Sequence, residues 1–221
     1  MQLSASRVLL TGATGGMGRA IVAALCARGA QVLVVGRQDK ALQALVERNP
    51  SQVSCLQADL RQPADRASVL RRAQQMGDIN LLINAAGINH FGLFENMQEQ
   101  AINDLIETNL TATLQLTHGL LPLLRSQPQS CVVNIGSTFG SIGYPGFSVY
   151  CATKFALRGF SEALRRELAD TNVGVLYLAP RATRTEMNNA AVEAMNAELQ
   201  VNMDSPELVA ERLVQALDAD L

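Results

Sequence analysis

Residues 7–18 read Arg7-Val-Leu-Leu-Thr-Gly-Ala-Thr-Gly-Gly-Met-Gly18, and this pattern is the strongest indication of the fold. A short apolar run enters a glycine-rich turn, and helical periodicity follows it, which predicts a buried parallel strand, a loop and a helix. Gly12, Gly16 and Gly18 would let the backbone turn tightly, approach a pyrophosphate and pack the helix against the sheet. The free N–H groups at the start of the helix would bind the phosphates. A glycine-rich turn without a ligand is the alternative.

Five further apolar runs read as strands and alternate with amphipathic segments. The expected strands are residues 31–36, 52–58, 80–83, 131–135 and 173–178, and the expected helices are residues 40–48, 63–76, 98–125, 150–170 and a last one from Ser205. No repeat or low-complexity linker interrupts them. Residues 1–221 are therefore predicted to form one α/β domain, a doubly wound Rossmann-type parallel sheet of six or seven strands with helices on both faces.

Composition narrows the classes of function. The 221 residues are 48% hydrophobic and 17% charged with a net charge of −2, which indicates a globular protein and argues against nucleic acid as a partner. No apolar run approaches about 18 residues, so no membrane span is expected, and residues 1–7 are too short and polar for a signal peptide. Four scattered cysteines favour a cytoplasmic location, and two histidines leave no metal site.

The end of the second strand bears on the choice of dinucleotide. An acidic residue there usually binds the ribose hydroxyls of NAD, whereas an arginine suits the 2′-phosphate of NADP. This chain has Gly36 followed by Arg37, and Asp39 is interpreted as a cap for the next helix. The pattern favours NADP over NAD, with a solvated Arg37 as the alternative.

Two other strand ends carry candidate cofactor contacts. Asp59 and Leu60 end the third strand, and Asp59 could accept a hydrogen bond from an adenine amino group or cap the helix that follows. The fourth strand leads into Asn84-Ala-Ala-Gly87, where small residues would let a cofactor lie close to the backbone.

Two polar residues occupy unusual places. Asn109 lies in the middle of a long expected helix, where asparagine is unfavourable, so its side chain is expected to have a role; satisfying buried backbone is the structural alternative. Ser137 follows the fifth strand, at the carboxyl edge where open parallel sheets bind ligands.

Tyr150 and Lys154 are four residues apart, so on a helix they share one face. Moving the pKa of a tyrosine from ~10 to near neutrality requires ~4 kcal/mol, which one cation about 4 Å away supplies at an effective dielectric of about 20. The pair is therefore expected to form a general acid or base, although most such pairs are ordinary surface residues.

Two further features bear on packing. Residues 184–204 contain Met187, Met195 and Met203, which suit a mobile lid over an apolar ligand, or ordinary core filling. Gly159 interrupts the helix that starts near Tyr150, and this predicts close packing with a neighbour.

Taken together, these motifs resemble the short-chain dehydrogenase/reductase family over nearly the whole chain. Residues 11–18 match its Thr-Gly-x-x-x-Gly-x-Gly motif, and residues 84–87 match its Asn-Ala-Ala-Gly motif. Asn109, Ser137, Tyr150 and Lys154 stand in the order of its catalytic tetrad.

The resemblance implies hydride transfer between a nicotinamide cofactor and an alcohol or ketone. Tyr150 would be the acid or base, Ser137 would hold the substrate oxygen, Lys154 would lower the Tyr150 pKa and bind the ribose, and Asn109 would hold a water in a proton relay. The implied cofactor contacts are Gly12, Thr14, Gly16, Met17, Gly18, Arg37, Asp59, Leu60, Asn84, Ala85, Ala86, Gly87, Tyr150, Lys154, Pro180, Thr183 and Thr185.

The chain departs from the family pattern in two places. Arg181 follows Pro180 where the family has glycine, and Arg181 could bind an acidic substrate group or be solvated. No seventh strand is evident after the last helix, so the sheet has six strands or a tail is missing.

The expected function is that of an NADP-dependent reductase of a mainly apolar ketone. A catalytically silent NAD(P)-binding regulator of the same fold is the alternative. The long helices resemble those that the family uses to form homodimers or homotetramers.

Overall fold

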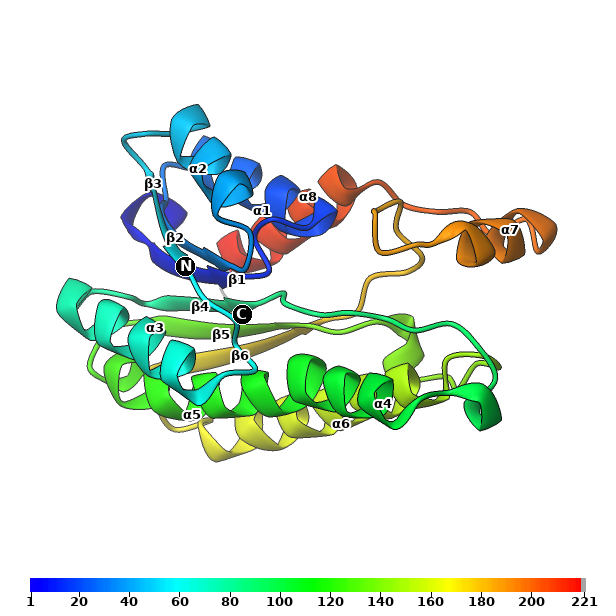
Figure 1. The fold of residues 1–221 in the computed structure, drawn as a ribbon. Coiled ribbons are helices and arrows are strands. Elements are labelled where there is room, and N and C mark those ends of the chain that lie inside the picture. The colour runs from blue at the N-terminus through cyan, green and yellow to red at the C-terminus, as the bar shows by residue number, and fades with distance from the viewer. Residues whose placement is uncertain (220–221) are drawn as a thin grey trace.

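The computed structural model describes residues 1–219, in which six parallel strands form one sheet in the order β3-β2-β1-β4-β5-β6 (Figure 1). The strands are β1 (Arg7–Thr11), β2 (Gln31–Gly36), β3 (Val53–Gln57), β4 (Leu81–Asn84), β5 (Ser130–Ile135) and β6 (Val173–Leu178). The predicted doubly wound Rossmann-type fold is confirmed, and the described residues contain no seventh strand.

Helices cover both faces of the sheet (Figure 1). One face carries α1 (Gly16–Ala27), α2 (Asp39–Arg48) and α8 (Pro206–Asp218). The other carries α3 (Pro63–Met76), α5 (Ala112–Arg125) and α6 (Ser148–Glu167), with α4 (Glu99–Ile106) beside α6. A short helix, α7 (Ala190–Glu198), projects from the body of the molecule between β6 and α8.

The strands are apolar throughout because each face of the sheet is covered. Val8 and Leu10 pack into the core under α1 and α8, whereas Leu9 packs into the opposite core under α3 and α5. All three side chains are fully buried. Alternate residues of a strand point to opposite faces, so one continuous apolar run supplies two cores.

The expected long helix at residues 98–125 is continuous but contains a π-turn. α4 passes into the π-turn Glu107–Thr111 and then into α5. A π-turn inserts one extra residue into the helix, and such turns are frequent at functional sites. Asn109 lies in this turn and is 1% exposed.

Side-chain capping differs between the N-termini of α2 and α8. Asp39 is not the cap of α2: it is the first helical residue, and the N-cap position is Gln38, which makes no side-chain cap. Ser205 does cap α8, since its hydroxyl accepts from the Leu208 N–H at 3.2 Å, and Pro206 occupies the first turn.

The inference that Gly159 marks close packing is wrong within the described chain. A Cβ built at Gly159 would meet no atom within 4 Å. A Cβ at Gly18 would lie 2.2 Å from the Gly12 carbonyl oxygen, so the start of α1 can approach the preceding loop only without a side chain.

Within residues 1–219 no helix combines the length and the apolar character needed to cross a bilayer. The same residues contain no cluster of three or more His, Cys, Asp or Glu side chains suited to a metal ion.

The two glycines should respond oppositely to alanine. We expect Gly159→Ala to raise the free energy of unfolding by about 0.5–1 kcal/mol, because alanine favours the helix and fits open space. Gly18→Ala should lower it by about 2 kcal/mol or more, since the new methyl overlaps backbone. Urea denaturation of both variants measures this, and destabilisation by Gly159→Ala would point to a contact with another subunit.

Candidate active site

The candidate site lies at the carboxyl edge of the sheet, where β1 and β4 are neighbours although far apart in sequence. Thr11 pairs with Asn84 at the last position of their ladder. The Thr11 hydroxyl accepts from the N–H groups of Ala85 at 3.1 Å and Ala86 at 3.2 Å. The connections leaving β1 and β4 depart in opposite directions here, which is the position where such sheets bind dinucleotides.

The glycine loop lies directly against the segment that leaves β4. Gly12 has a φ of +67°, and a Cβ there would lie 2.6 Å from the Ala85 oxygen and from the Ala86 nitrogen. Gly15 precedes α1 and offers no side-chain cap, so the first N–H groups of α1 receive no cap from it. Thr14 borders Gly36 at the end of β2, and Met17 packs toward the core instead of outward. The loop therefore has the backbone shape and the N–H donors that a pyrophosphate requires.

Arg37 and Asp59 lie near each other at the ends of β2 and β3. Arg37 is exposed, and its charge contributes to lowering the pKa of Asp59. The largest cause of that lowering is the hydrogen bond from Arg61, whose guanidinium lies 2.7 Å from the carboxylate. Asp59 does not cap α3, because the N-cap position is Gln62. The cap alternative for Asp59 is therefore wrong.

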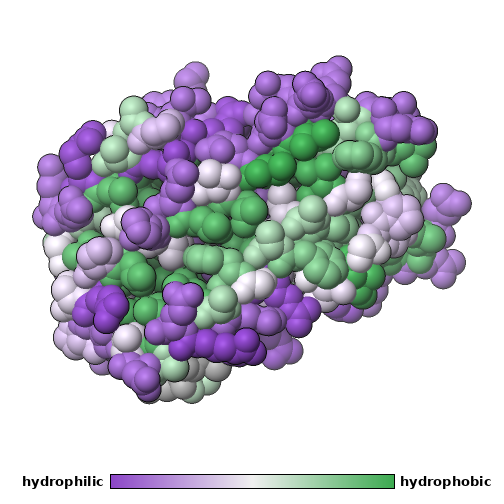
Figure 2. Space-filling model, turned by 90° about the horizontal axis from the view of Figure 1, so that it is seen from below, coloured by the Kyte–Doolittle hydropathy of each residue, from purple (hydrophilic) through white to green (hydrophobic). Residues whose placement is uncertain are grey.

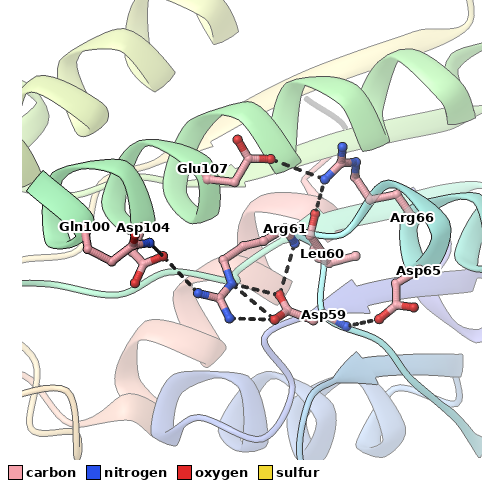
Figure 3. A network of polar contacts seen from close by, with 8 residues as sticks. All are labelled: Asp59, Leu60, Arg61, Asp65, Arg66, Gln100, Asp104 and Glu107. Atoms are coloured by element: carbon pink, nitrogen blue, oxygen red, sulfur yellow. Dashed lines mark hydrogen bonds and ion pairs between the residues drawn. The ribbon is translucent and has the colours of Figure 1, made fainter.

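Two arginines tie this corner of the sheet to the helix that carries Asn109 (Figure 3). Arg61 reaches from Asp59 to Asp104 on α4, at 3.0 Å. Arg66 donates to the Leu60 carbonyl at 2.5 Å and lies 3.3 Å from Glu107, the first residue of the π-turn. We call Arg61 and Arg66 the arginine struts.

Asn109 bridges the π-turn and the segment that follows β4. Its Oδ1 accepts from the Ile88 N–H at 2.8 Å, and its Nδ2 donates to the Ile88 carbonyl at 2.9 Å and to Thr153 Oγ1 at 3.2 Å. A Cβ at Gly87 would lie 3.4 Å from Asn109 Oδ1 and 3.9 Å from Lys154 Nζ. The side chain thus satisfies backbone, the structural alternative, and it borders Gly87, as Lys154 does.

Ser137, Tyr150 and Lys154 come together from β5 and α6. The Ser137 hydroxyl accepts from the Phe139 N–H at 3.1 Å, and Ser137 lies close enough to Tyr150 to oppose the rise in the pKa of the tyrosine. Lys154 is 5% exposed, donates from Nζ to the Ile135 carbonyl at 3.0 Å, and lies 5.6 Å from the centre of the Tyr150 ring. The four tetrad residues therefore lie within one region at the carboxyl edge.

The expected lowering of the Tyr150 pKa by Lys154 is wrong for this structure. Burial raises the pKa of Tyr150 to about 12, and the Ser137 hydrogen bond opposes that rise only in part. Burial also lowers the pKa of Lys154 to about 8. Desolvation by burial is the largest cause of both shifts.

An aromatic cluster surrounds Tyr150. The rings of Phe139 and Phe147 lie 6.3 Å and 6.1 Å from the Tyr150 ring, and Phe91 lies 5.0 Å from Phe147. Val192 and Met195 of α7 pack on the same cluster. The segment expected to be a lid therefore covers an apolar surface beside the tyrosine.

The residues after β6 that were expected to contact the cofactor have different surroundings. The Pro180 carbonyl accepts from the Thr138 N–H at 3.1 Å, close to Ser137. Thr183 is buried, and its hydroxyl donates to the Arg181 carbonyl, so it is engaged with its own segment. Thr185 lies against the glycine loop, where its Cγ2 would be 3.1 Å from a Cβ on Gly16. Arg181 pairs with Asp204 while its side chain stays 60% exposed, which agrees with the solvated alternative.

Sequence reasoning missed the arginine struts and Glu186. The struts join partners 43 and 41 residues apart, and Glu186 contacts Arg19 across 167 residues. The sequence carries no periodic signal for such pairs, because each is a single charged residue on a loop or a helix.

These features define a dinucleotide-binding α/β protein with a serine–tyrosine–lysine centre. Residues 6–196 match the short chain dehydrogenase family. The chain is 32% identical over 198 residues to the 3-oxoacyl-[acyl-carrier-protein] reductase FabG of Escherichia coli (strain K12), covering 89% of this chain and 81% of that protein.

Solved structures agree with this match. A short-chain dehydrogenase from Sphingobium yanoikuyae, in complex with NADPH, has a TM-score of 0.88 and 30% identity, covering 97% of this chain and 85% of that one. The closed form of serine dehydrogenase complexed with NADP+ has a TM-score of 0.86 and 31% identity, covering 95% and 88%. The chain belongs to the short-chain dehydrogenase/reductase family and is an oxidoreductase of that family.

The buried lysine makes a prediction about stability and pH. The pKa of Lys154 in the folded chain, about 8, lies below its ordinary value of 10.5, so between these values the unfolded chain binds the proton more tightly. The contribution of Lys154 to the free energy of unfolding therefore rises with pH from about 8 upward, by at most about 1.4 kcal/mol per pH unit.

We expect the free energy of unfolding of the wild type, relative to Lys154→Met, to increase by about 1–2 kcal/mol between pH 8 and pH 9.5. Urea denaturation at both pH values measures the difference. Parallel curves for the two proteins would show that Lys154 keeps an ordinary pKa.

Proposed function

We propose that this protein reduces a ketone to a secondary alcohol with NADPH. The observation that carries the proposal is the convergence of Ser137, Tyr150 and buried Lys154 at the carboxyl edge of the sheet, where Lys154 Nζ lies 5.6 Å from the centre of the Tyr150 ring, one helical turn along α6. The names of the relatives support it: reduction of a 3-oxoacyl group is reduction of a ketone, and the Sphingobium enzyme was solved with NADPH.

The residues present fit a dinucleotide. Gly12 lets the glycine loop pack against Ala85 and Ala86, a Cβ on Gly15 would meet only the Gly12 oxygen at 3.6 Å, and the start of α1 offers N–H groups to phosphate. Arg37 would hold the 2′-phosphate, Asp59 the adenine, and Lys154 the nicotinamide ribose. When bound, the nicotinamide supplies the hydride.

Proton transfer is assigned to the chain's own side chains. Ser137 would hold the carbonyl oxygen, and Tyr150 would donate a proton to that oxygen as negative charge develops on it. A tyrosine with a pKa of about 12 keeps its proton at neutral pH, which suits a donor in the direction of reduction. Lys154 would stabilise the tyrosinate that remains, and Asn109 would orient a water that returns a proton through Lys154.

The substrate is proposed to be mainly apolar. Phe91, Phe139 and Phe147 gather beside Tyr150, and Val192 and Met195 cover them. We also propose that residues 1–221 act as one domain, with residues 184–204 as the lid over this surface.

A homodimer or homotetramer is proposed through the face formed by α4 and α6. An apolar groove of about 440 Å³ lies there, lined mainly by Ile102, Ile106, Leu110, Val149 and Ala152. Exposed Ile106 and Phe155 add apolar surface, and Figure 2 shows a hydrophobic band across the face that these helices cover. Four cysteines without a disulfide support a cytoplasmic location.

Removal of the Tyr150 hydroxyl tests the mechanism. We expect Tyr150→Phe to lower kcat for ketone reduction by about 10²–10⁴-fold, because the proton donor is lost, and to leave NADPH binding nearly unchanged. Stopped assays of NADPH oxidation with a panel of apolar ketones measure it. Undiminished turnover would contradict the mechanism, and NADPH binding without turnover by either protein would favour the silent regulator.

Substitution of Arg37 tests the preference for NADPH over NADH. Arg37→Gln should weaken NADPH binding by about 10–100-fold, because a charge-assisted contact to the 2′-phosphate is lost, and should leave NADH binding unchanged. Lys40→Gln, an exposed cation on α2, is the control. Fluorescence titration with both nucleotides gives the affinities, and equal weakening of NADH would assign Arg37 a role other than reading the phosphate.

A further inference from the structure

The start of α1 receives an anion from a distant part of the chain. No acidic residue lies in the first turn of α1, and its N-cap Gly15 contributes no side chain. Glu186, eight residues beyond β6, supplies the carboxylate instead. A Cβ built on Gly16 would lie 3.0 Å from Glu186 Oε2, so the carboxylate lies against the backbone of the glycine loop.

Arg19 fixes Glu186 in this place. Its guanidinium binds Glu186 Oε1 and also donates to the Thr14 carbonyl at 2.5 Å, so one side chain joins the glycine loop to the segment after β6. The pKa of Glu186 is lowered first by its own backbone N–H, then by Arg19, and also by the Gly16 N–H. The carboxylate is therefore ionised at neutral pH, paired with Arg19 and adjacent to the backbone of Gly16 at the start of α1.

We propose that Glu186 is an internal competitor at the pyrophosphate end of α1, and that its release from Gly16 and Arg19 accompanies binding of the dinucleotide. This inference rests on the proposed function, because it takes the glycine loop to be the pyrophosphate site. The ligand class is a dinucleotide or any fragment that contains its pyrophosphate.

Competition follows from the shared donors and the shared sign of charge. One N–H group cannot point fully at two anions, and the carboxylate repels a pyrophosphate placed beside it. When a ligand must first displace an internal group, its apparent affinity is lower than its intrinsic affinity. The reduction is set by the fraction of molecules in which the site is open. Glu186 is a residue that sets cofactor affinity without contributing to the chemical step.

The side chain has room to leave. Glu186 is 69% exposed, and a cavity of about 1130 Å³ adjoins Gly16, Arg19 and Glu186 between the segment after β6 and the outer faces of α1 and α8. Its departure breaks one surface ion pair and the contact with the Gly16 backbone, and no core contact, which costs little.

The test compares Glu186→Gln with Glu193→Gln. Glutamine keeps the size of the side chain and removes its charge, and Glu193 lines the same cavity from α7, so it is a control for the general change in charge. The probes are NADPH, followed by fluorescence, and ADP-ribose and adenosine 2′-phosphate, each competed against NADPH. ADP-ribose contains the pyrophosphate and adenosine 2′-phosphate does not. Thermal melting checks that both variants fold.

We expect Glu186→Gln to bind NADPH and ADP-ribose about tenfold more tightly than the wild type. Adenosine 2′-phosphate should bind equally to both proteins, and Glu193→Gln should bind all three ligands as the wild type does. Tighter binding of NADPH by Glu186→Gln when the wild type binds none would support the proposal as well.

Three results would overturn it. Unchanged or weaker binding of ADP-ribose by Glu186→Gln contradicts the competition while leaving ketone reduction intact. Equal tightening for adenosine 2′-phosphate, or for Glu193→Gln, assigns the effect to overall charge. Absence of NADPH binding by the wild type and both variants contradicts the proposed function itself, and this inference with it.

Discussion

The contact between two turns of backbone, at the ends of β1 and β4, is the constraint on which the rest of the site depends. Gly12 lies so close to Ala85 and Ala86 that no Cβ fits between them, and the Thr11 hydroxyl holds the N–H groups of both alanines. This contact fixes where α1 starts and where the segment toward Asn109 leaves the sheet. The N–H groups at the start of α1 and the tetrad residues are therefore positioned by the same contact.

Burial accounts for most of the chemistry of the tetrad. The Lys154 ammonium group is buried away from water and donates to the Ile135 carbonyl, and Tyr150 lies among aromatic rings. Desolvation shifts the two pKa values in opposite directions, each toward the neutral form. The position of α6 against β5 buries Lys154, and the aromatic cluster buries Tyr150.

Local pattern was enough to predict the strands and most helices, because the strands are apolar runs and the helices are amphipathic repeats. The positions of Ser137, Tyr150 and Lys154 followed from strand ends and helix spacing. Sequence could not give the direction in which Lys154 Nζ donates, since that depends on the carbonyl of Ile135, 19 residues away. It could not give the arginine struts or the Glu186 contact for the same reason, and it placed Asp39 as a cap although the backbone there is already helical.

The π-turn at Glu107–Thr111 also sets the rotational phase of the helix that contains it. Each residue of an α-helix advances about 100° around the axis, so one inserted residue rotates everything before it by that amount relative to everything after it. Leu116 and Leu120 of α5 consequently face the sheet, while Ile102 and Ile106 of α4 face the groove beside α6. A single inserted residue thus lets one continuous helix serve the core of its own domain and present a second apolar stripe in a different direction.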